Sequence, residues 1–340
     1  MKQAVMTAPG KIQFFDVEKP APKDDEVVMQ TRRIGVCGSD IHVYHGMHPY
    51  TGYPVVQGHE VGGVVTALGR NVSGLRVGDK VTFMPQVTCG KCYPCTHGMY
   101  HICESLKVMG FQTGGAAQEY FALPADNVLK LPDTISLDEA AFIEPVSVTV
   151  HAIGRGGGAE GKNVLVLGAG PIGNLTAQVA RACGARAVMI TDVSAYKLDK
   201  ARQCGIEFAV NTAQENLGEA LLRDFGPAKA DLILECVGVE GTITDAVLNA
   251  RKGTNIVVVG VFGKKPQVDL GLVQDRELSL IGTLMYQKAD YLKAIDLVTN
   301  GKLSLDQMIT HRFPFDRYLD AYHAIEASKG EYLKVMIELN

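Results

Sequence analysis

The spacing of hydrophobic and polar residues changes character near residue 136. Before that point, short apolar segments alternate with turn residues such as Pro20, Pro22 and Gly78, which is typical of β-strands joined by turns. We predict strands over residues 3–6, 12–17, 26–34, 61–68 and 80–83, and a short helix over residues 37–44. This part of the chain therefore predicts a barrel-like or sandwich-like β domain with long functional loops.

From Ser136 onward, helical and strand-like segments alternate along the chain. Ser136 and Glu139 form a capping box that predicts the start of a helix, and an apolar run continues this helix with an interruption at Pro145. Strands are predicted over residues 163–167, 187–191, 231–235 and 256–261, and helices over residues 172–183, 195–204 and 242–250. This alternation predicts a parallel sheet with helices on both faces.

Composition excludes several classes of protein. A chain of 340 residues with 46% hydrophobic and 21% charged residues is an ordinary globular protein of about two domains. A net charge of -4 argues against a nucleic-acid partner or an anionic membrane. The N-terminus lacks the apolar run of a signal peptide, so we expect a cytoplasmic protein. Eight cysteines then indicate metal ligands and buried thiols, not disulfides.

A glycine-rich motif follows the predicted strand at residues 163–167. Gly168, Gly170 and Gly173 form G-x-G-x-x-G, in which the glycines permit a tight turn, close approach of a pyrophosphate and helix–strand packing. Alone, this pattern also fits a plain strand–helix turn. The next strand, however, ends in Asp192, at the distance expected for a carboxylate on the adenosine ribose. Asp192 repels a 2′-phosphate and favours NAD over NADP, although Lys197 could flank the same ribose.

Four cysteines are concentrated in one loop. Cys89, Cys92, Cys95 and Cys103 have the spacing C-x2-C-x2-C-x7-C, which suits a closed tetrahedral structural zinc site. The first three could begin an iron–sulfur motif, but the fourth spacing is wrong and no proline follows Cys103. We predict a structural zinc ion.

A second, dispersed set of candidate ligands comprises Cys37, His59 and Glu60. A lone cysteine or histidine is more often a core residue, but three ligands of mixed S, N and O type with an open fourth position are typical of catalytic zinc. Glu144 adds a carboxylate that could bind the zinc ion directly or through a bound water molecule.

These motifs resemble, in the same order, those of the zinc-dependent medium-chain alcohol dehydrogenases. The segment Gly58-His59-Glu60-x2-Gly63-x5-Gly69-x2-Val72 is similar to the zinc signature of that family. The segments at residues 144–147, 151–152 and 310–314 resemble its sorbitol (polyol) dehydrogenase branch, and residues 48–56 are similar to bacterial sugar-acid relatives such as L-galactonate oxidoreductase.

The resemblance implies a fold and an activity. It implies an α/β protein in which a Rossmann doubly wound parallel sheet is inserted in a GroES-like β-barrel catalytic domain. The implied segments are residues 1–150 (catalytic domain), 151–284 (dinucleotide-binding domain) and 285–340 (return to the catalytic domain). The implied enzyme is a homo-oligomer, dimer or tetramer, with NAD and two zinc ions per subunit. It transfers hydride from a secondary alcohol of a polyol, sugar or sugar acid to NAD.

The resemblance also assigns roles to residues. Ser39 and His42 fall on proton-relay positions, Asp40 on the partner of the zinc histidine, and Glu144 on the extra carboxylate. The positions for dinucleotide contacts are Gly168, Gly170, Pro171, Ile172, Gly173, Asp192, Lys197, Val237, Val259, Gly260, Val261, Thr283, Leu284 and Met285. The substrate pocket is expected to involve Tyr44, Phe111, Tyr120 and Tyr286.

Two departures bear on the substrate. Polyol dehydrogenases usually carry Arg-Tyr where this chain has Met285-Tyr286, and the missing guanidinium weakens the case for sorbitol itself. Animal sorbitol dehydrogenases lack the four-cysteine loop, so the match is to bacterial relatives. The alternatives are a butanediol-type or threonine-type dehydrogenase, the latter with Asp expected in place of Glu144, a zinc-free reductase, and a non-catalytic nucleotide-binding scaffold.

Overall fold

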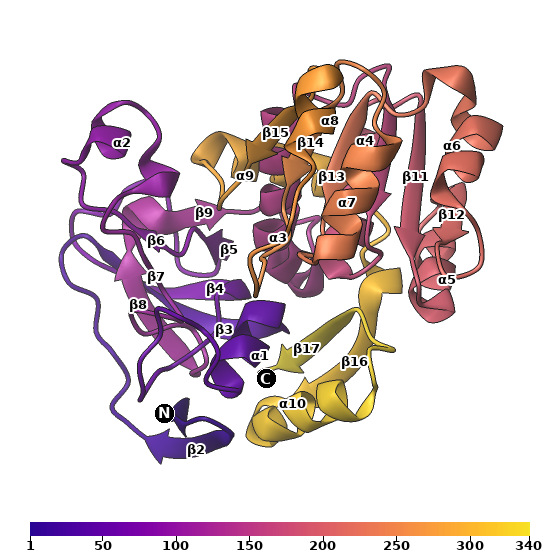
Figure 1. Ribbon diagram of the computed structural model, residues 1–340. Helices are drawn as coiled ribbons and strands as arrows, with labels where there is room; N and C mark the ends of the chain where they lie inside the picture. The colour runs from indigo at the N-terminus through magenta and orange to yellow at the C-terminus, as the bar shows by residue number, and fades with distance from the viewer. The chain divides into compact units, whose positions relative to one another are not determined.

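The structure, a computed structural model that describes residues 1–340, divides into two compact units (Figure 1). Unit 1 consists of Met1–Glu144 and Ile309–Asn340, and unit 2 consists of Pro145–Met308. These limits differ from the predicted ones at 150 and 284. Strand β15 (Ser279–Gly282) and helix α9 (Lys288–Thr299) belong to unit 2, so the chain leaves that unit only after Met308.

Unit 1 is built on a seven-stranded sheet centred on β3 (Glu26–Val36). The strand order is β16-β17-β3-β4-β5-β9, and β8 also pairs with β3. Neighbours are antiparallel except β16 and β17, which are parallel. The other strands are β4 (Glu60–Leu68), β5 (Lys80–Phe83), β8 (Tyr120–Pro124), β9 (Val128–Lys130), β16 (Ile309–Pro314) and β17 (Lys334–Glu338).

Smaller elements complete unit 1. They are the pair β1 (Lys2–Ala8) and β2 (Lys11–Asp16), the pair β6 (Gln86–Val87) and β7 (Lys107–Val108), helices α1 (Gly38–Tyr44), α2 (Tyr93–Thr96) and α10 (Tyr318–Ala327), and 3-10 turns at Tyr100–Ile102, Ala125–Asn127 and Phe315–Arg317. The five predicted strands and the short helix after Cys37 are all present.

The core of unit 1 lies against β3. Val27 and Met29 of this strand are fully buried and belong to the same hydrophobic cluster as Val61 of β4 and Phe83 of β5, and Val28 between them is also fully buried. Each such side chain contributes roughly 1.5–3 kcal/mol by leaving water. The register of β3 against its neighbours is therefore fixed strongly, because a slip by one residue would turn these side chains to the other face.

The C-terminal strand β17, yellow in Figure 1, pairs with the end of β3 that leads to Cys37. In this antiparallel pair Val335 lies opposite Val36, and Met336 lies opposite Gly35. The last segment of the chain therefore borders the predicted catalytic zinc ligands.

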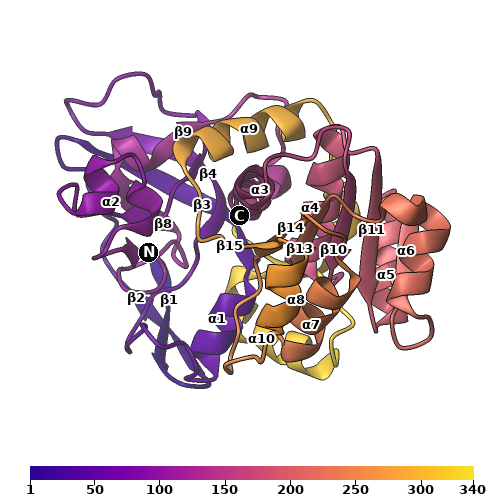
Figure 2. The same ribbon diagram turned by 45° about the horizontal axis from the view of Figure 1, so that its top comes forward.

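Unit 2 contains a six-stranded sheet in which every strand is parallel to its neighbours, in the order β12-β11-β10-β13-β14-β15. This is the doubly wound order of dinucleotide-binding folds, and it confirms the predicted fold class. The strands β11, β10, β13, β14 and β15 are labelled in Figure 2. The remaining strands are β10 (Asn163–Leu167), β11 (Ala187–Asp192), β12 (Phe208–Asn211), β13 (Leu232–Glu235) and β14 (Asn255–Val258). Adjacent central strands supply fully buried side chains such as Leu165, Met189, Ile233 and Ile256.

The helices that connect these strands are α4 (Pro171–Ala182), α5 (Ala195–Gln203), α6 (Leu217–Phe225), α7 (Glu240–Asn249) and α8 (Leu270–Asp275), with 3-10 turns at Gly226–Ala228 and Asp306–Met308. Helix α3 (Leu137–Arg155) begins with the predicted capping box at Ser136. The expected interruption at Pro145 does not occur, because the helix continues through the proline. The loss of one backbone hydrogen bond is outweighed by the buried apolar turns on either side. None of the helices has the length and apolar character needed to cross a membrane.

Candidate functional site: two zinc sites and a dinucleotide site

The ends of two neighbouring strands bring the first ligand set together. Cys37 follows β3 as the N-cap of α1, while His59 and Glu60 lie at the start of β4, and the sheet register pairs Gly35 with Glu60. The Sγ atom of Cys37, a ring nitrogen of His59 and a carboxylate oxygen of Glu60 lie within 4.8 Å of one another. Residues far apart in the sequence therefore converge because β3 and β4 are antiparallel neighbours.

A buried chain of hydrogen bonds leads to Asp40, whose carboxylate faces His59. Tyr322 of α10 donates its hydroxyl to Gln57 Oε1 at 2.7 Å, and Gln57 Nε2 donates to Asp40 Oδ1 at 3.2 Å. Asp40 Oδ1 in turn lies 3.6 Å from His59 Nδ1. Asp40 is also fixed by α1, because its Oδ2 accepts a hydrogen bond of 2.9 Å from the backbone N–H of Cys37. The structure thus places Asp40 behind the ring of His59, as the family resemblance implies.

The electrostatic field at the site favours a cation. Burial opposes a charge on His59, but the carboxylate of Asp40 and the thiol of Cys37 outweigh it and raise the pKa of His59 well above its usual value. Burial raises the pKa of Asp40, although the nearby His59 opposes this effect. Glu144, which is 6% exposed, adds to the negative field at His59. Because groups that attract a proton to this position also attract a divalent metal, the field fits a zinc ion.

Lys334 of β17 is the buried ammonium group of the site. Its Nζ lies 2.5 Å from Glu60 Oε2, and its side chain is 4% exposed. Burial lowers the pKa of Lys334, but the charges of Glu60 and Cys37 outweigh it and raise the pKa above its usual value. Lys334 therefore remains an ammonium ion that compensates part of the negative charge around the ligands.

Ser39 and His42 lie on the same side of α1, three residues apart along the helix. Ser39 is half-buried and His42 is exposed, so this side of α1 extends from the vicinity of Cys37 to solvent. Two nearby histidines, His45 and His48, contact other side chains of unit 1. The ring of His45 lies 3.4 Å from Glu326, and the ring of His48 stacks on Phe111.

The four-cysteine loop forms the second zinc site, around α2 (Figure 1). One sulfur atom from each of Cys89, Cys92, Cys95 and Cys103 lies within 4.8 Å of the others. The distance of 3.8 Å between Cys92 Sγ and Cys103 Sγ equals the edge of about 3.8 Å expected for a tetrahedron with Zn–S bonds of about 2.3 Å. Backbone N–H groups of Lys91 and Cys92 lower the pKa of Cys89 to about 6, which favours the thiolate form that binds zinc.

The glycine motif has the geometry of a phosphate-binding turn. Gly168 has φ +98°, and a Cβ atom on Gly173 would lie 1.8 Å from the carbonyl oxygen of Gly168. Gly170 is the N-cap of α4, Pro171 is its first residue, and no atom lies within 4 Å of a Cβ position on Gly170. The helix N-terminus therefore has open space where a pyrophosphate binds in folds of this type.

Asp192, at the end of β11, supports this turn. Its Oδ2 accepts a hydrogen bond of 2.8 Å from the N–H of Ala169, and its Oδ1 accepts one of 2.9 Å from the N–H of Ser194. Lys197 lies in the first turn of α5, directly after that junction. Asp192 is thus held next to the glycine motif, as the sequence predicts for a ribose-binding carboxylate.

Other predicted dinucleotide contacts follow the carboxyl ends of adjacent parallel strands. Val237 comes after β13, residues 259–261 follow β14, and residues 283–285 follow β15. Val261 is 78% exposed and Leu284 is 56% exposed, so both side chains are accessible to a ligand. Glu235 contacts two of these loops. Its side-chain Oε1 accepts the N–H groups of Val237 and Gly238 at 2.9 and 2.8 Å, and its main-chain carbonyl oxygen accepts those of Val259 and Gly260 at 2.8 and 2.9 Å.

The four aromatic residues expected at the substrate pocket have different surroundings. Phe111 packs on the ring of His59 with a centroid distance of 4.8 Å, so it borders the zinc ligands. Tyr44 packs on Tyr322 at 5.1 Å. Tyr120 lies under the ammonium group of Lys19. Tyr286 is fully buried in unit 2 against Tyr291.

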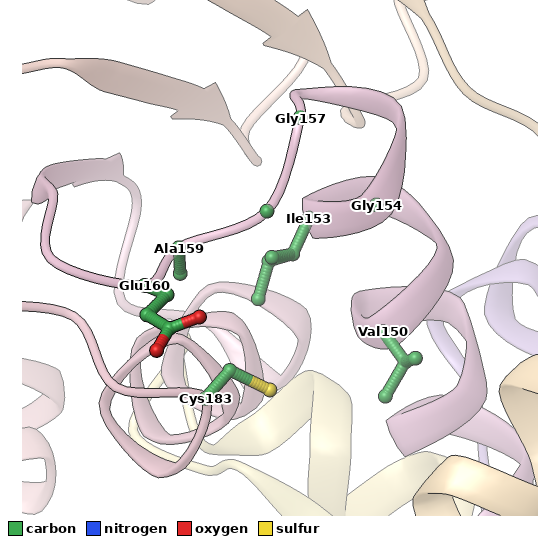
Figure 3. Close-up of a pocket in the computed structure, with 8 residues that line it drawn as sticks. Val150, Ile153, Gly154, Gly157, Ala159, Glu160 and Cys183 are labelled. Atoms are coloured by element: carbon green, nitrogen blue, oxygen red, sulfur yellow. The ribbon is translucent and has the colours of Figure 1, made fainter.

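A pocket of about 530 Å³ lies elsewhere in unit 2 (Figure 3). It is lined by the end of α3, the turn before β10 and Cys183 at the end of α4. The glycine motif lies at the opposite ends of β10 and α4, so this pocket is distinct from the dinucleotide site.

Comparisons with known proteins agree with the motifs. Residues 23–133 match the alcohol dehydrogenase GroES-like domain, and residues 171–300 match the zinc-binding dehydrogenase family. A sorbitol dehydrogenase of Halalkalibacterium halodurans is 34% identical over 344 residues, with 99% of both chains covered. An L-galactonate-5-dehydrogenase of Escherichia coli K12 is 31% identical over 337 residues, covering 99% of this chain and 98% of the relative.

Solved structures show the same similarity. The structure of the alcohol dehydrogenase rspB from Escherichia coli CFT073, in complex with NADH, has a TM-score of 0.92 and 32% identity, and covers 100% of this chain and 99% of its own. The chain belongs to the zinc-containing medium-chain dehydrogenase family. The predicted family, fold class and enzyme class are confirmed, and Cys37, His59 and Glu60 come together, as do the four cysteines. Glu144, the fourth predicted ligand of the catalytic zinc, is not part of the converging set and remains a prediction.

Three residues of this zinc-dependent dehydrogenase are missed by motif reasoning: Gln57, Tyr322 and Lys334. Gln57 directly precedes the His59 signature, but glutamine is not a residue that zinc signatures highlight. Lys334 had a visible signal, because a lysine at the start of the apolar segment Val335–Ile337 is unusual in a buried strand.

Proposed function

We propose that this dehydrogenase oxidises a secondary alcohol of a polyol, sugar or sugar acid to the ketone, reversibly, with NAD as the hydride acceptor. The observation that carries the proposal is the convergence of Cys37, His59 and Glu60 into a buried set of mixed S, N and O donors. Three such ligands with room for one more are typical of catalytic zinc, whereas the four-cysteine set is closed and structural. A zinc ion at the open site supplies Lewis acidity, which lowers the pKa of an alcohol that it contacts.

The residues of the chain orient the ligands and move the proton. Asp40, which is held by Gln57, lies 3.6 Å from His59 Nδ1, where its negative charge increases the basicity of the ring as a metal ligand. The hydroxyl of Ser39 accepts the proton of the substrate alcohol and passes it to the ring of His42, which releases it to solvent. The half-buried position of Ser39 and the exposure of His42 on the same helix support this order.

The cofactor preference rests on Asp192. A carboxylate beside the glycine motif binds the two ribose hydroxyls of NAD and repels the 2′-phosphate of NADP. Its hydrogen bond to Ala169 supports this role, because the same bond ties the carboxylate to the phosphate-binding turn. Lys197 is the residue nearby that could reduce the preference.

We further propose that the enzyme is a cytoplasmic homo-oligomer, dimer or tetramer. Strand β15 has one neighbour in its sheet, so one of its edges presents unpaired backbone groups, and Leu280 on this strand is 39% exposed. Such an edge is suited to pairing with another chain. Eight unpaired cysteine thiols, four of them in a zinc site, fit a reducing compartment.

A substrate screen tests the proposal. Purified zinc-loaded protein is incubated with NAD and a panel of polyols and aldonates, with L-threonine and 2,3-butanediol as members of other classes, while NADH absorbance is followed. We expect turnover of at least one polyol, sugar or sugar acid and none in the Cys37→Ala variant. Turnover of only threonine or butanediol would reject the substrate class. No turnover of any alcohol by zinc-replete protein would reject the enzymatic proposal.

A further inference from the structure

The ion pair between Lys334 and Glu60 spans three strands of the sheet. Lys334 begins β17, Glu60 begins β4, and β3 runs between them. Met336, Gly35 and Glu60 lie side by side in the register of these strands. A Cβ atom on Gly35 would lie 2.3 Å from Glu60 Oε2. The absence of a side chain on the middle strand therefore lets the ammonium and the carboxylate meet across it.

The ion pair distinguishes the two carboxylate oxygen atoms of Glu60. Oε2 is bound to Lys334 Nζ at 2.5 Å, whereas no contact of Oε1 with this ammonium group is recorded. Lys334 Nζ also lies 3.5 Å from the carbonyl oxygen of Val36, next to Cys37. Both charged side chains are almost completely buried, so water does not screen their interaction. An ammonium at this distance draws negative charge away from the carboxylate that faces the metal.

We propose that Lys334 is a positioning residue that restrains Glu60 to one-oxygen contact with the catalytic zinc ion, which keeps this ligand weak and a coordination position open for the substrate. This inference rests on the zinc-dependent function proposed above. Without Lys334, both oxygens of Glu60 are available to zinc, the metal is held more tightly, and substrate competes less well for the same position.

The decisive variant is Lys334→Met, which keeps an unbranched side chain and removes the charge. The assay measures the rate at which the catalytic zinc passes to a chromophoric chelator, with the four-cysteine zinc as an internal reference. We expect release to be at least about tenfold slower than in wild type, because the buried charge that opposes the metal is gone, together with a lower kcat. Lys334→Arg should restore release to within about threefold of wild type, since a cation is retained.

A second measurement separates this role from a structural one. With Co²⁺ in place of the catalytic zinc, Lys334→Met should weaken the visible d–d absorption, because cobalt with an additional oxygen ligand absorbs less than four-coordinate cobalt. In the Glu60→Gln background, the same substitution should change metal release by less than about twofold, because the effect acts through Glu60. Lys130→Met, which breaks the 2.7 Å pair with Asp79 in the same unit, is the matched control and should leave release unchanged.

Each outcome decides the inference. Unchanged or faster release from folded Lys334→Met, or an effect of the same size in the Glu60→Gln background, would overturn it. If Lys334→Met does not fold, Lys334→Gln replaces it in the same comparison, with the same slower release expected and the same results contradicting it. A wild-type protein that binds only the four-cysteine zinc would reject the proposed function itself, which is a result distinct from failure of the role of Lys334.

Discussion

Replacing Asp40 by asparagine tests the support of the zinc histidine with almost no change in shape. Asp40 is 1% exposed, and its carboxylate faces the N–H of Cys37, the side-chain amide of Gln57 and the ring of His59. An asparagine offers one oxygen and one NH₂ group to the same neighbours. If the oxygen stays on Cys37, the NH₂ group faces the NH₂ group of Gln57 and the Nδ1 atom of His59. If the side-chain amide of the asparagine is rotated by half a turn, the backbone N–H of Cys37 loses its acceptor.

The magnitude follows from this mismatch. One buried donor without an acceptor costs about 1–3 kcal/mol. Loss of the carboxylate behind a ligating histidine typically lowers zinc affinity about 10–100-fold, which corresponds to about 1.4–2.7 kcal/mol of binding free energy. We therefore expect Asp40→Asn to lose the catalytic zinc at chelator concentrations about 10–100-fold lower than wild type, and to retain the four-cysteine zinc.

The assay is a chelator titration followed by metal analysis of the desalted protein. Asp79→Asn is the control, since Asp79 is another largely buried aspartate of unit 1 that binds Lys130 at 2.7 Å instead of a zinc ligand. Its thermal stability should fall without any change in zinc retention. Equal zinc retention by Asp40→Asn and wild type would refute the reasoning that Asp40 strengthens His59 as a ligand.

The remaining predictions concern the structural zinc, the cofactor and the response to acid. Cys95→Ala should lose one zinc ion and melt at a lower temperature, whereas the enzyme that remains folded should keep a kcat within about threefold of wild type. The reason is that a structural zinc site contributes to folding and not to chemistry. An unchanged zinc content would contradict this prediction. Wild type should show a higher kcat/KM with NAD than with NADP. Asp192→Ala should weaken NAD binding without a matching gain for NADP, because the substitution also removes the acceptor of the Ala169 N–H in the phosphate-binding turn. A complete reversal of the cofactor preference would show that Asp192 has no role in the turn. Burial raises the pKa of Asp138, but Arg312 and Arg33 outweigh it and hold the pKa below its usual value. The lowered pKa stabilises the fold above about pH 4, and this contribution is lost as the pH falls through the folded pKa. Urea unfolding of wild type and Asp138→Asn should therefore differ at pH 7, and the difference should shrink as the pH is lowered below about 4. A constant difference would refute the assignment.

Local motifs made much of the dehydrogenase predictable. The four cysteines lie within fifteen residues and form one loop, so their spacing alone indicates a zinc site. The glycine motif is likewise continuous, and the strand before it and the helix after it have strong apolar periodicity. Cys37 and His59 are separated in sequence, so only the chemistry of a mixed S, N and O ligand set joined them, with support from the family resemblance.

The supporting residues of the catalytic site were not predictable in the same way. Tyr322 reaches Gln57 across 265 residues, and Lys334 reaches Glu60 across 274 residues. These contacts depend on the return of β17 to the edge of β3, and neither hydrophobic periodicity nor residue spacing determines which polar side chains meet there. The predicted interruption of α3 at Pro145 was wrong for a related reason. Burial of the neighbouring apolar residues stabilises the continuous helix, although a proline locally disfavours it.

The central claim is that a zinc ion held by Cys37, His59 and Glu60 is required for alcohol oxidation. Metal analysis and kcat/KM, measured on the same preparations of wild type and Cys37→Ala with the substrate found in the screen, test it most directly. We predict two zinc ions per chain in wild type, matching the two ligand sets, and one in the variant. Activity of the variant should be lower by roughly 1000-fold or more, since loss of a Lewis acid removes several kcal/mol of transition-state stabilisation. A Cys37→Ala protein that keeps both zinc ions, or that turns over substrate at the wild-type rate with only one, would contradict the account.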